Sequence, residues 1–302
     1  YKINEQKGET VMKRKLAVAT ALTMSALMGL SLGGCGSTGG GQTGNSSSDK
    51  KTDDDKTITF WNVGTEGADK ETYEMAIEMF NKNNKDGWTI ENVPTQNDKY
   101  KEKLVIAMSS GECPDMYTSW SGGPMNEYIK SGYAQPLDDL YEKYGLKDRF
   151  MDGALENASY DRKLYAIPVK NISVAGIYYN KDLFEKYNIE VPKTLEDLEK
   201  ACDTFLENGI TPFTLANSTK WTGSMYFQCL AARKGGLEPF QKAADGTGSF
   251  EDESFEWAGE KIQEWVNKGY FPDGFNSMSE DDGQSRQLFY QETAAMYLIG
   301  TY

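Results

Sequence analysis

The chain has 302 residues, of which 32 are lysine or arginine and 46 are aspartate or glutamate, giving a formal net charge of -14. A surface with this acidic excess repels phosphate backbones, so nucleic-acid binding is not expected. The sequence contains no histidine, which excludes imidazole-based catalytic triads and the usual zinc sites, and no cofactor or metal is predicted.

The N-terminal part has the features of an export signal. Residues 1–11 lack an initiator Met and precede a start at Met12, so they are predicted to be an upstream, non-native segment. In residues 12–35 a basic head is followed by an uncharged, mostly apolar run and small residues, the order of a signal peptide.

The signal ends in Leu32-Gly33-Gly34-Cys35, which resembles a lipobox, the site where bacterial lipoproteins are cleaved and acylated. Cys35 is therefore the predicted lipidation site. A plain transmembrane anchor is the alternative, although the apolar run, residues 16–32, is at the lower limit of length for a membrane span. Residues 36–57, almost entirely Gly, Ser, Thr, Asn, Asp and Lys, are predicted to be a flexible tether because they have too little apolar surface to bury.

The remaining residues are enough for one large or two medium domains. Besides Cys35 they hold Cys113, Cys202 and Cys229, an odd number at wide spacing that does not suggest a disulfide framework. A bridge between Cys202 and Cys229 and two free thiols both remain open.

Strands alternate with helices in the first half of this region. Strands are predicted over 58–63, 88–93 and 115–120, and helices over 73–80, 100–108, 125–130 and 137–144. Tyr73, Ala76, Ile77 and Phe80 follow helical spacing, as do Tyr100, Leu104 and Met108. This alternation predicts a mainly parallel sheet with helices on its faces.

The second half repeats the mixture of strands and helices. Extended runs over 164–169 and 173–179 flank Lys170-Asn171, where the chain is expected to cross between two lobes. Helices are predicted over 180–187, 195–205 (with Thr194 as N-cap), 222–233, 255–268 and 284–290, and strands over 212–215 and 294–299. The predicted domains are thus an N-terminal lobe, 58–169, and a C-terminal lobe, 170–302.

Several motifs in this region resemble those of one family. They are residues 58–64, Gly111-Glu112-Cys113-Pro114-Asp115 with Trp120 and Ser131-Gly132-Tyr133, Tyr165-Ala166-Ile167-Pro168 with Tyr178-Tyr179-Asn180-Lys181-Asp182-Leu183, and Leu288-Phe289 with Ala294-Ala295-Met296 and Gly300-Thr301-Tyr302. Together they resemble the extracellular solute-binding proteins of ABC transporters, in the sugar-binding group that includes maltose-binding protein. Two positions depart from the family pattern: Glu292 or Thr293 stands in place of a Gly, and Tyr302 stands in place of a Trp.

The resemblance implies an α/β, two-lobe periplasmic-binding-protein-like fold of type II, with mainly parallel sheets flanked by helices. Family members usually continue beyond the point matching Tyr302, so the C-terminal part is expected to be missing. The implied function is capture of a sugar, such as an oligosaccharide, in an interlobe cleft and delivery to the permease of an ABC importer. The implied protein is an extracytoplasmic monomer without enzyme activity, anchored to the membrane by its N-terminal lipid.

Ligands of open α/β sheets bind at the carboxyl ends of the strands, so residues after predicted strands are the site candidates. Sugars offer flat C–H faces and hydroxyls, which aromatic planes and carboxylates or amides bind. Trp61 is a candidate for either the core or the site, and Lys170 and Asn171 for either ligand contacts or a solvated hinge. The residues predicted to bind ligand on these grounds are Trp61, Thr65, Glu66, Trp120, Ser121, Lys170 and Asn171. The resemblance supports Trp120, which matches a stacking aromatic of the family, and it implies two more: Trp221, which matches a ligand-contacting loop, and Tyr302, which holds the aromatic position of the final motif.

Two alternative functions are a cell-surface glycoside hydrolase and a binder of a non-sugar small solute. Glycoside hydrolysis requires paired carboxylates. The acidic clusters at 53–55, 138–139, 251–253 and 280–282 lie in contexts typical of a solvated surface, and none has a distinctive spacing. No catalytic residue is therefore predicted.

Overall fold

The computed structural model describes residues 56–170 and 173–302. The predicted signal peptide, Cys35, nearly all of the tether, and Asn171 lie outside the described residues. Within the described part of the chain, no helix combines the length and apolar character needed to cross a membrane.

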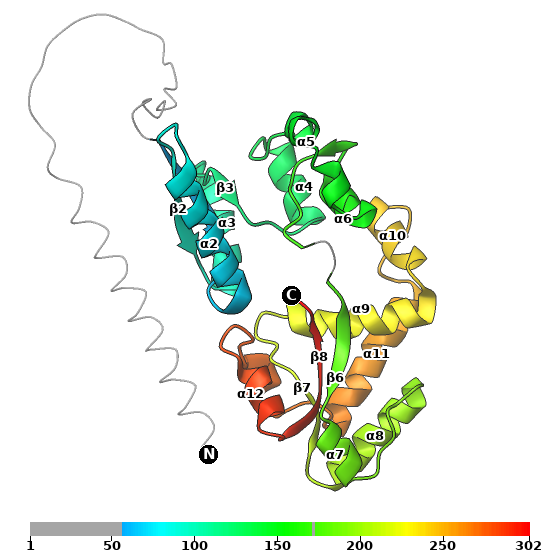
Figure 1. Ribbon diagram of the computed structural model, residues 1–302. Coiled ribbons are helices and arrows are strands. Elements are labelled where there is room, and N and C mark those ends of the chain that lie inside the picture. The colour runs from blue at the N-terminus through cyan, green and yellow to red at the C-terminus, as the bar shows by residue number, and fades with distance from the viewer. Residues whose placement is uncertain (1–55, 171–172) are drawn as a thin grey trace, which may run out of the picture. The chain divides into compact units, whose positions relative to one another are not determined.

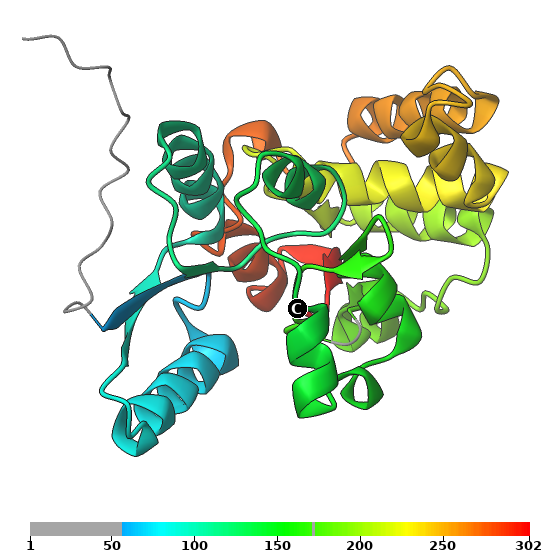
Figure 2. The same cartoon turned by 90° about the horizontal axis from the view of Figure 1, so that it is seen from above.

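The first sheet has three parallel strands in the order β2-β1-β3. These are β1 (Thr57–Asn62), β2 (Thr89–Pro94) and β3 (Met116–Tyr117), joined by the crossover helices α2 (Gly67–Asn83) and α3 (Asn97–Ser110). Successive strand residues point to opposite faces. Accordingly, Phe60 contacts Tyr73 of α2, while Trp61 packs against the core of α3, and Figure 2 shows these two helices on opposite sides of the strands.

The two helices differ in how much they bury. In α3 the predicted face of Tyr100, Leu104 and Met108 is buried, and the helix ends at Gly111, whose left-handed φ of 76° suits glycine. The predicted helix over 73–80 forms part of α2, but α2 has no buried residue, and Met75 and Met79 are exposed. The helical spacing was therefore informative about conformation at α2 and not about burial.

Short elements follow the first sheet. They are α4 (Gly123–Lys130), α5 (Asp138–Tyr144), a 3-10 turn (Lys147–Arg149), α6 (Asp152–Asn157), β4 (Ser159–Tyr160) and β5 (Lys163–Leu164). The last two pair as a small antiparallel hairpin. A minor core of Tyr141, Ala158 and Leu164 holds them together. The predicted extended run over 164–169 contributes only its first residue to a strand.

The second sheet has the order β6-β8-β7, with β6 (Ala175–Tyr179), β7 (Thr211–Thr214) and the central β8 (Ala294–Gly300). β7 is parallel to β8 and β6 is antiparallel to it, so this sheet is mixed where a mainly parallel one was expected. An antiparallel edge strand on an otherwise parallel sheet is common, and here Ile177 and Tyr178 of that edge are exposed.

Helices surround the second sheet, as Figure 1 shows. They are α7 (Lys181–Lys186), α8 (Leu195–Glu207), α9 (Trp221–Gly235), α10 (Glu238–Asp245), α11 (Glu253–Lys268), a 3-10 turn (Phe275–Ser277) and α12 (Gln284–Tyr290). Thr194 caps α8 as predicted: its hydroxyl accepts the amide of Asp197, whose carboxylate accepts the amide of Thr194.

The main core lies between the second sheet and its helices. Phe213 of β7 stacks on Trp265 of α11 at a centroid distance of 5.8 Å and meets Tyr226 of α9 edge-on at 5.5 Å. Helix α8 adds Phe205, which is fully buried. Aromatic pairs of this kind stabilise a fold beyond the area that they bury.

All three cysteines in the described residues are free. Cys202 is completely buried, and burial raises the pKa of its thiol, so it behaves as a small apolar side chain. The bridge between Cys202 and Cys229 that the sequence left open is absent here.

Candidate functional site

Three aromatic residues predicted as ligand contacts are linked by ring contacts, two of them to the same lysine. Trp120 follows β3, Trp221 is the first residue of α9, and Tyr302 follows β8. The Nζ of Lys101 on α3 lies 4.8 Å from the ring centroid of Trp120 and 5.7 Å from that of Trp221. The rings of Trp221 and Tyr302 meet edge-on at 6.1 Å. The structure thus gathers residues that the sequence separates by 182 positions, from Trp120 to Tyr302.

Trp120 is positioned by the buried Tyr100. The two rings meet edge-on at 5.9 Å, and the Tyr100 hydroxyl donates to the carbonyl of Thr118 at 2.7 Å. Burial raises the pKa of Tyr100, so its hydroxyl stays protonated and keeps donating. Trp120 itself is 36% exposed, which leaves part of its indole available to a ligand.

Trp221 is positioned by the loop before α9. The Oδ1 of Asn217 accepts the amide of Gly223 at 3.0 Å, so the loop folds back onto the first turn of the helix. A Cβ at Gly223 would lie 2.5 Å from that oxygen, so the approach requires glycine. The buried Nε1 of Trp221 has no hydrogen-bond acceptor among the described residues, which leaves a donor unsatisfied.

Tyr302 is held by its own strand end. Its ring lies against Gly300, where an added Cβ would come within 2.0 Å of Cε1. The hydroxyl donates to Sδ of Met225 at 3.5 Å, and burial raises the pKa of this phenol. The side chain remains 56% exposed overall, so both Tyr302 and Trp120 present aromatic surface.

Polar contacts join residues of the first sheet's segment to residues of the second sheet's segment. The amide of Asp98, in the first turn of α3, donates to Oδ2 of Asp281 at 2.7 Å. The hydroxyl of Thr219 donates to Oδ2 of Asp98 at 2.9 Å, and Arg286 pairs with Glu66 at 3.1 Å. Asp281 therefore acts as an N-terminal cap for a helix that lies 183 residues earlier in the chain.

Sequence reasoning missed Asp98, Lys101 and Asp281. The prediction that residues 280–282 form a solvated acidic surface was wrong for Glu280, which is 8% exposed and accepts the hydroxyl of Tyr297 through Oε1. Burial raises the pKa of both Glu280 and Asp281, and for Asp281 it outweighs the lowering by the Asp98 amide and by Lys101. No spacing in the sequence signals these contacts, because the partners come from distant segments.

The other predicted residues have separate surroundings. Trp61 is half-buried against the core of α3, with Nζ of Lys103 3.8 Å from its ring centroid. The amide of Thr65 donates to the carbonyl of Val63, and Ser121 is exposed. Lys170 pairs with Asp69 of α2 at 2.9 Å. The structure therefore does not bring Trp61 or Lys170 to the aromatic group through any of these contacts.

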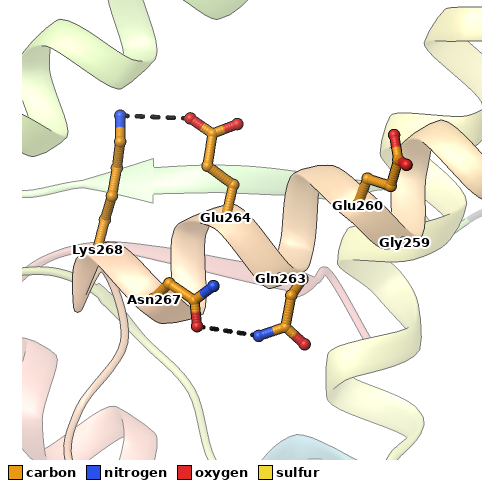
Figure 3. Close-up of a pocket in the computed structure, with 6 residues that line it drawn as sticks. All are labelled: Gly259, Glu260, Gln263, Glu264, Asn267 and Lys268. Atoms are coloured by element: carbon orange, nitrogen blue, oxygen red, sulfur yellow. Dashed lines mark hydrogen bonds and ion pairs between the residues drawn. The ribbon is translucent and has the colours of Figure 1, made fainter.

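A surface hollow of about 680 Å³ lies elsewhere, along α11 (Figure 3). One helix supplies its six lining residues: Gly259, Glu260, Gln263, Glu264, Asn267 and Lys268. Its side chains satisfy one another, since Gln263 donates to Asn267 at 3.1 Å and Lys268 pairs with Glu264 at 3.4 Å. The hollow contains no predicted site residue and is an ordinary helix surface. Residues 56–170 and 173–302 contain no cluster of acidic or cysteine side chains suited to a metal ion.

Comparison with models of known protein families shows which family the chain belongs to. The model of the bacterial extracellular solute-binding proteins matches residues 64–302. This chain belongs to that family. Among its curated relatives, this chain is 26% identical over 240 residues to an uncharacterised ABC transporter extracellular-binding protein of Pyrococcus horikoshii, and it covers 53% of that relative. It is also 26% identical over 180 residues to the melibiose/raffinose/stachyose-binding protein MelE of Bacillus subtilis, and covers 40% of it. The chain thus spans about half the length of the curated relatives it matches, or less.

Solved structures agree with the fold. One of them, from work on xylan utilisation by Caldanaerobius polysaccharolyticus, is 36% identical to this chain and superposes on it with a TM-score of 0.75. The match covers 81% of this chain and 61% of that one. A chitin oligosaccharide binding protein superposes with a TM-score of 0.73 at 23% identity, over 81% of this chain and 62% of that one. These matches confirm the predicted type II α/β solute-binding fold.

Proposed function

We propose that this chain captures a neutral sugar, such as an oligosaccharide, and delivers it to the permease of an ABC importer. The observation that carries the proposal is a group of aromatic residues from three distant segments, in which Trp120 and Trp221 share Lys101 and Tyr302 contacts Trp221. Aromatic faces are suited to the C–H faces of pyranose rings, and the neighbouring carboxylates and hydroxyls are suited to sugar hydroxyls.

The charges beside the rings favour an uncharged ligand. Asp98 lies one helical turn from Lys101 and its amide donates to Asp281, so among these groups two carboxylates accompany one cation. An anionic ligand would meet this excess and the net charge of -14, whereas a polyol needs only donors and acceptors. This supports a neutral sugar over an acidic solute.

The relatives support the same ligand class. One curated relative is named for melibiose, raffinose and stachyose, another is the multiple sugar-binding protein of Streptococcus mutans, and the structure at 36% identity comes from work on xylan utilisation. Xylo-oligosaccharides are therefore the first probes that we would choose, followed by chitin oligosaccharides and the raffinose series.

The cellular arrangement rests on the sequence. We propose acylation at Cys35, a tether over 36–57, lobes over 58–169 and 170–302 that close on the sugar by hinge bending, and a monomeric, extracytoplasmic protein without catalytic activity. Loss of membrane retention after Cys35→Ala would support the anchor, and unchanged membrane association would contradict it.

The test is a calorimetric screen of the chain against those sugars, followed by the double variant Trp120→Ala with Trp221→Ala. Each lost stacking contact is expected to weaken binding by about two- to tenfold, since such contacts contribute about 0.5–1.5 kcal/mol. Trp88→Ala is the matched control, because Trp88 is 42% exposed and flanks β2. Indifference to every saccharide, or equal behaviour of the double variant and the control, would refute the proposal. Release of reducing ends would indicate a glycoside hydrolase instead.

A further inference from the structure

Lys101 lies where the proposed function needs a sugar. Its Nζ is within 6 Å of the ring centroids of both Trp120 and Trp221, at 4.8 and 5.7 Å. Cation–π attraction operates at these distances. The side chain is half-buried, so part of its stem is already packed. One indole face cannot hold an ammonium group and a pyranose ring at the same time.

We propose that Lys101 occupies the indole faces of Trp120 and Trp221 when no sugar is bound, and that sugar binds by displacing it. The inference rests on the proposed function and deepens it, because it makes Lys101 an affinity-determining residue of the same site. In this role Lys101 shields two aromatic surfaces that would otherwise face water in the absence of ligand. Its displacement is a cost that every sugar must overcome.

The surroundings provide an alternative position for the displaced ammonium group. Lys101 lies one turn after Asp98, whose carboxylate accepts from Thr219 and whose amide donates to Asp281. The charge of Lys101 is felt at Asp281, where it lowers the pKa against the raising effect of burial. A lysine that leaves the rings therefore stays close to compensating carboxylates, and the displacement does not strand a charge.

The strength of the cation–π contact of Lys101 determines how much its removal should change the sugar affinity. A cation over an exposed aromatic ring adds a modest attraction, and Lys101 lies over two rings. Removing the cation is expected to tighten sugar binding by roughly tenfold, which corresponds to about 1.4 kcal/mol. A guanidinium group stacks on indole better than an ammonium group does, so arginine is expected to bind the rings more strongly and to weaken sugar binding.

The experiment measures the dissociation constant of the full chain for the tightest sugar of the screen, for wild type, Lys101→Gln and Lys101→Arg. Lys99→Gln is the matched control, because Lys99 lies on the same helix, is 74% exposed and pairs with Glu102. The expected order of affinity is Lys101→Gln, then wild type equal to Lys99→Gln, then Lys101→Arg. Tryptophan emission provides a second measurement: Lys101→Gln should change the spectrum of the unliganded protein and leave that of the sugar complex unaltered.

Two failures can be told apart. If wild type binds no saccharide, the proposed function fails and the role of Lys101 fails with it. If wild type binds sugar through Trp120 and Trp221, but Lys101→Gln binds it as weakly as Lys99→Gln or more weakly, only the displacement proposal fails. Weaker binding by Lys101→Gln would mean that the lysine donates to the sugar in place of competing with it.

Discussion

The amide of Asp98 donates a hydrogen bond to Asp281, and this bond joins the segment of the first sheet to that of the second. Asp281 contributes both an acceptor oxygen and a negative charge to this contact, and variants can test the two separately. Its N···O distance is 2.7 Å, and Asp281 is half-buried. Burial raises the pKa of Asp281 even though the amide lowers it, so the negative charge itself is less favourable here than in water. The acceptor oxygen, rather than the charge, is therefore expected to stabilise the contact.

The expected loss of stability differs between two variants of Asp281. Asp281→Ala removes the acceptor and leaves the first turn of α3 without this partner, which should cost about 1 kcal/mol, the typical net contribution of one hydrogen bond. For a chain of this size that loss lowers the melting temperature by about 2–4 °C. Asp281→Asn keeps an oxygen in place and removes the penalised charge, so its melting temperature at pH 7 should equal or exceed that of wild type.

The assay combines thermal unfolding with amide hydrogen exchange. Exchange at Asp98 should accelerate in Asp281→Ala and stay slow in Asp281→Asn. Asp282→Ala is the control, because Asp282 is the exposed neighbour and its loss should change neither measurement. Equal destabilisation by Asp281→Asn and Asp281→Ala would refute the reasoning, since the charge would then be the stabilising element. Unaltered exchange at Asp98 in Asp281→Ala would refute it as well.

Three further variants test the fold and its pH response. Thr194→Ala should lower the stability of α8 by about 1 kcal/mol, because the cap is lost. In the same urea titration, Thr204→Ala in the same helix should be neutral or slightly stabilising. Equal effects of the two variants would contradict the capping role. Glu280→Gln should gain in melting temperature relative to wild type as the pH rises from about 4 to 7, because a raised carboxyl pKa makes the folded wild type lose stability as that carboxyl ionises. A constant or opposite difference would contradict this sign. Phe213→Ala should lower the free energy of unfolding by about 3–5 kcal/mol, because it leaves a cavity between α9 and α11. Tyr290→Ala is the exposed control and should change it little. A small loss for Phe213→Ala in urea unfolding would contradict the prediction and show that the core collapses around the gap.

Local patterns predicted much of this architecture. Helical spacing located α3 and α11, the Thr194 signal located the start of α8, and β-prone runs located β1, β7 and β8 within a residue or two. These features depend on side-chain periodicity and on hydrogen bonds between near neighbours, which a sequence carries directly. The resemblance to the solute-binding family, together with the strand end before Trp120, led to the aromatic candidates Trp120, Trp221 and Tyr302.

Tertiary structure alone decided which of those candidates meet and what lies between them. The sequence leaves Trp61 open between the core and the site, and only the structure shows that it packs against the core of α3 while Trp120 shares a lysine with Trp221. Nothing local distinguishes Lys101 from Lys103, two residues apart on one helix, because their partners are brought in by the sheets. Residues 280–282 make the same point: a run of acids has the composition of a solvated loop, and only the packing of β8 and α3 around it buries one carboxylate and gives another an amide to accept.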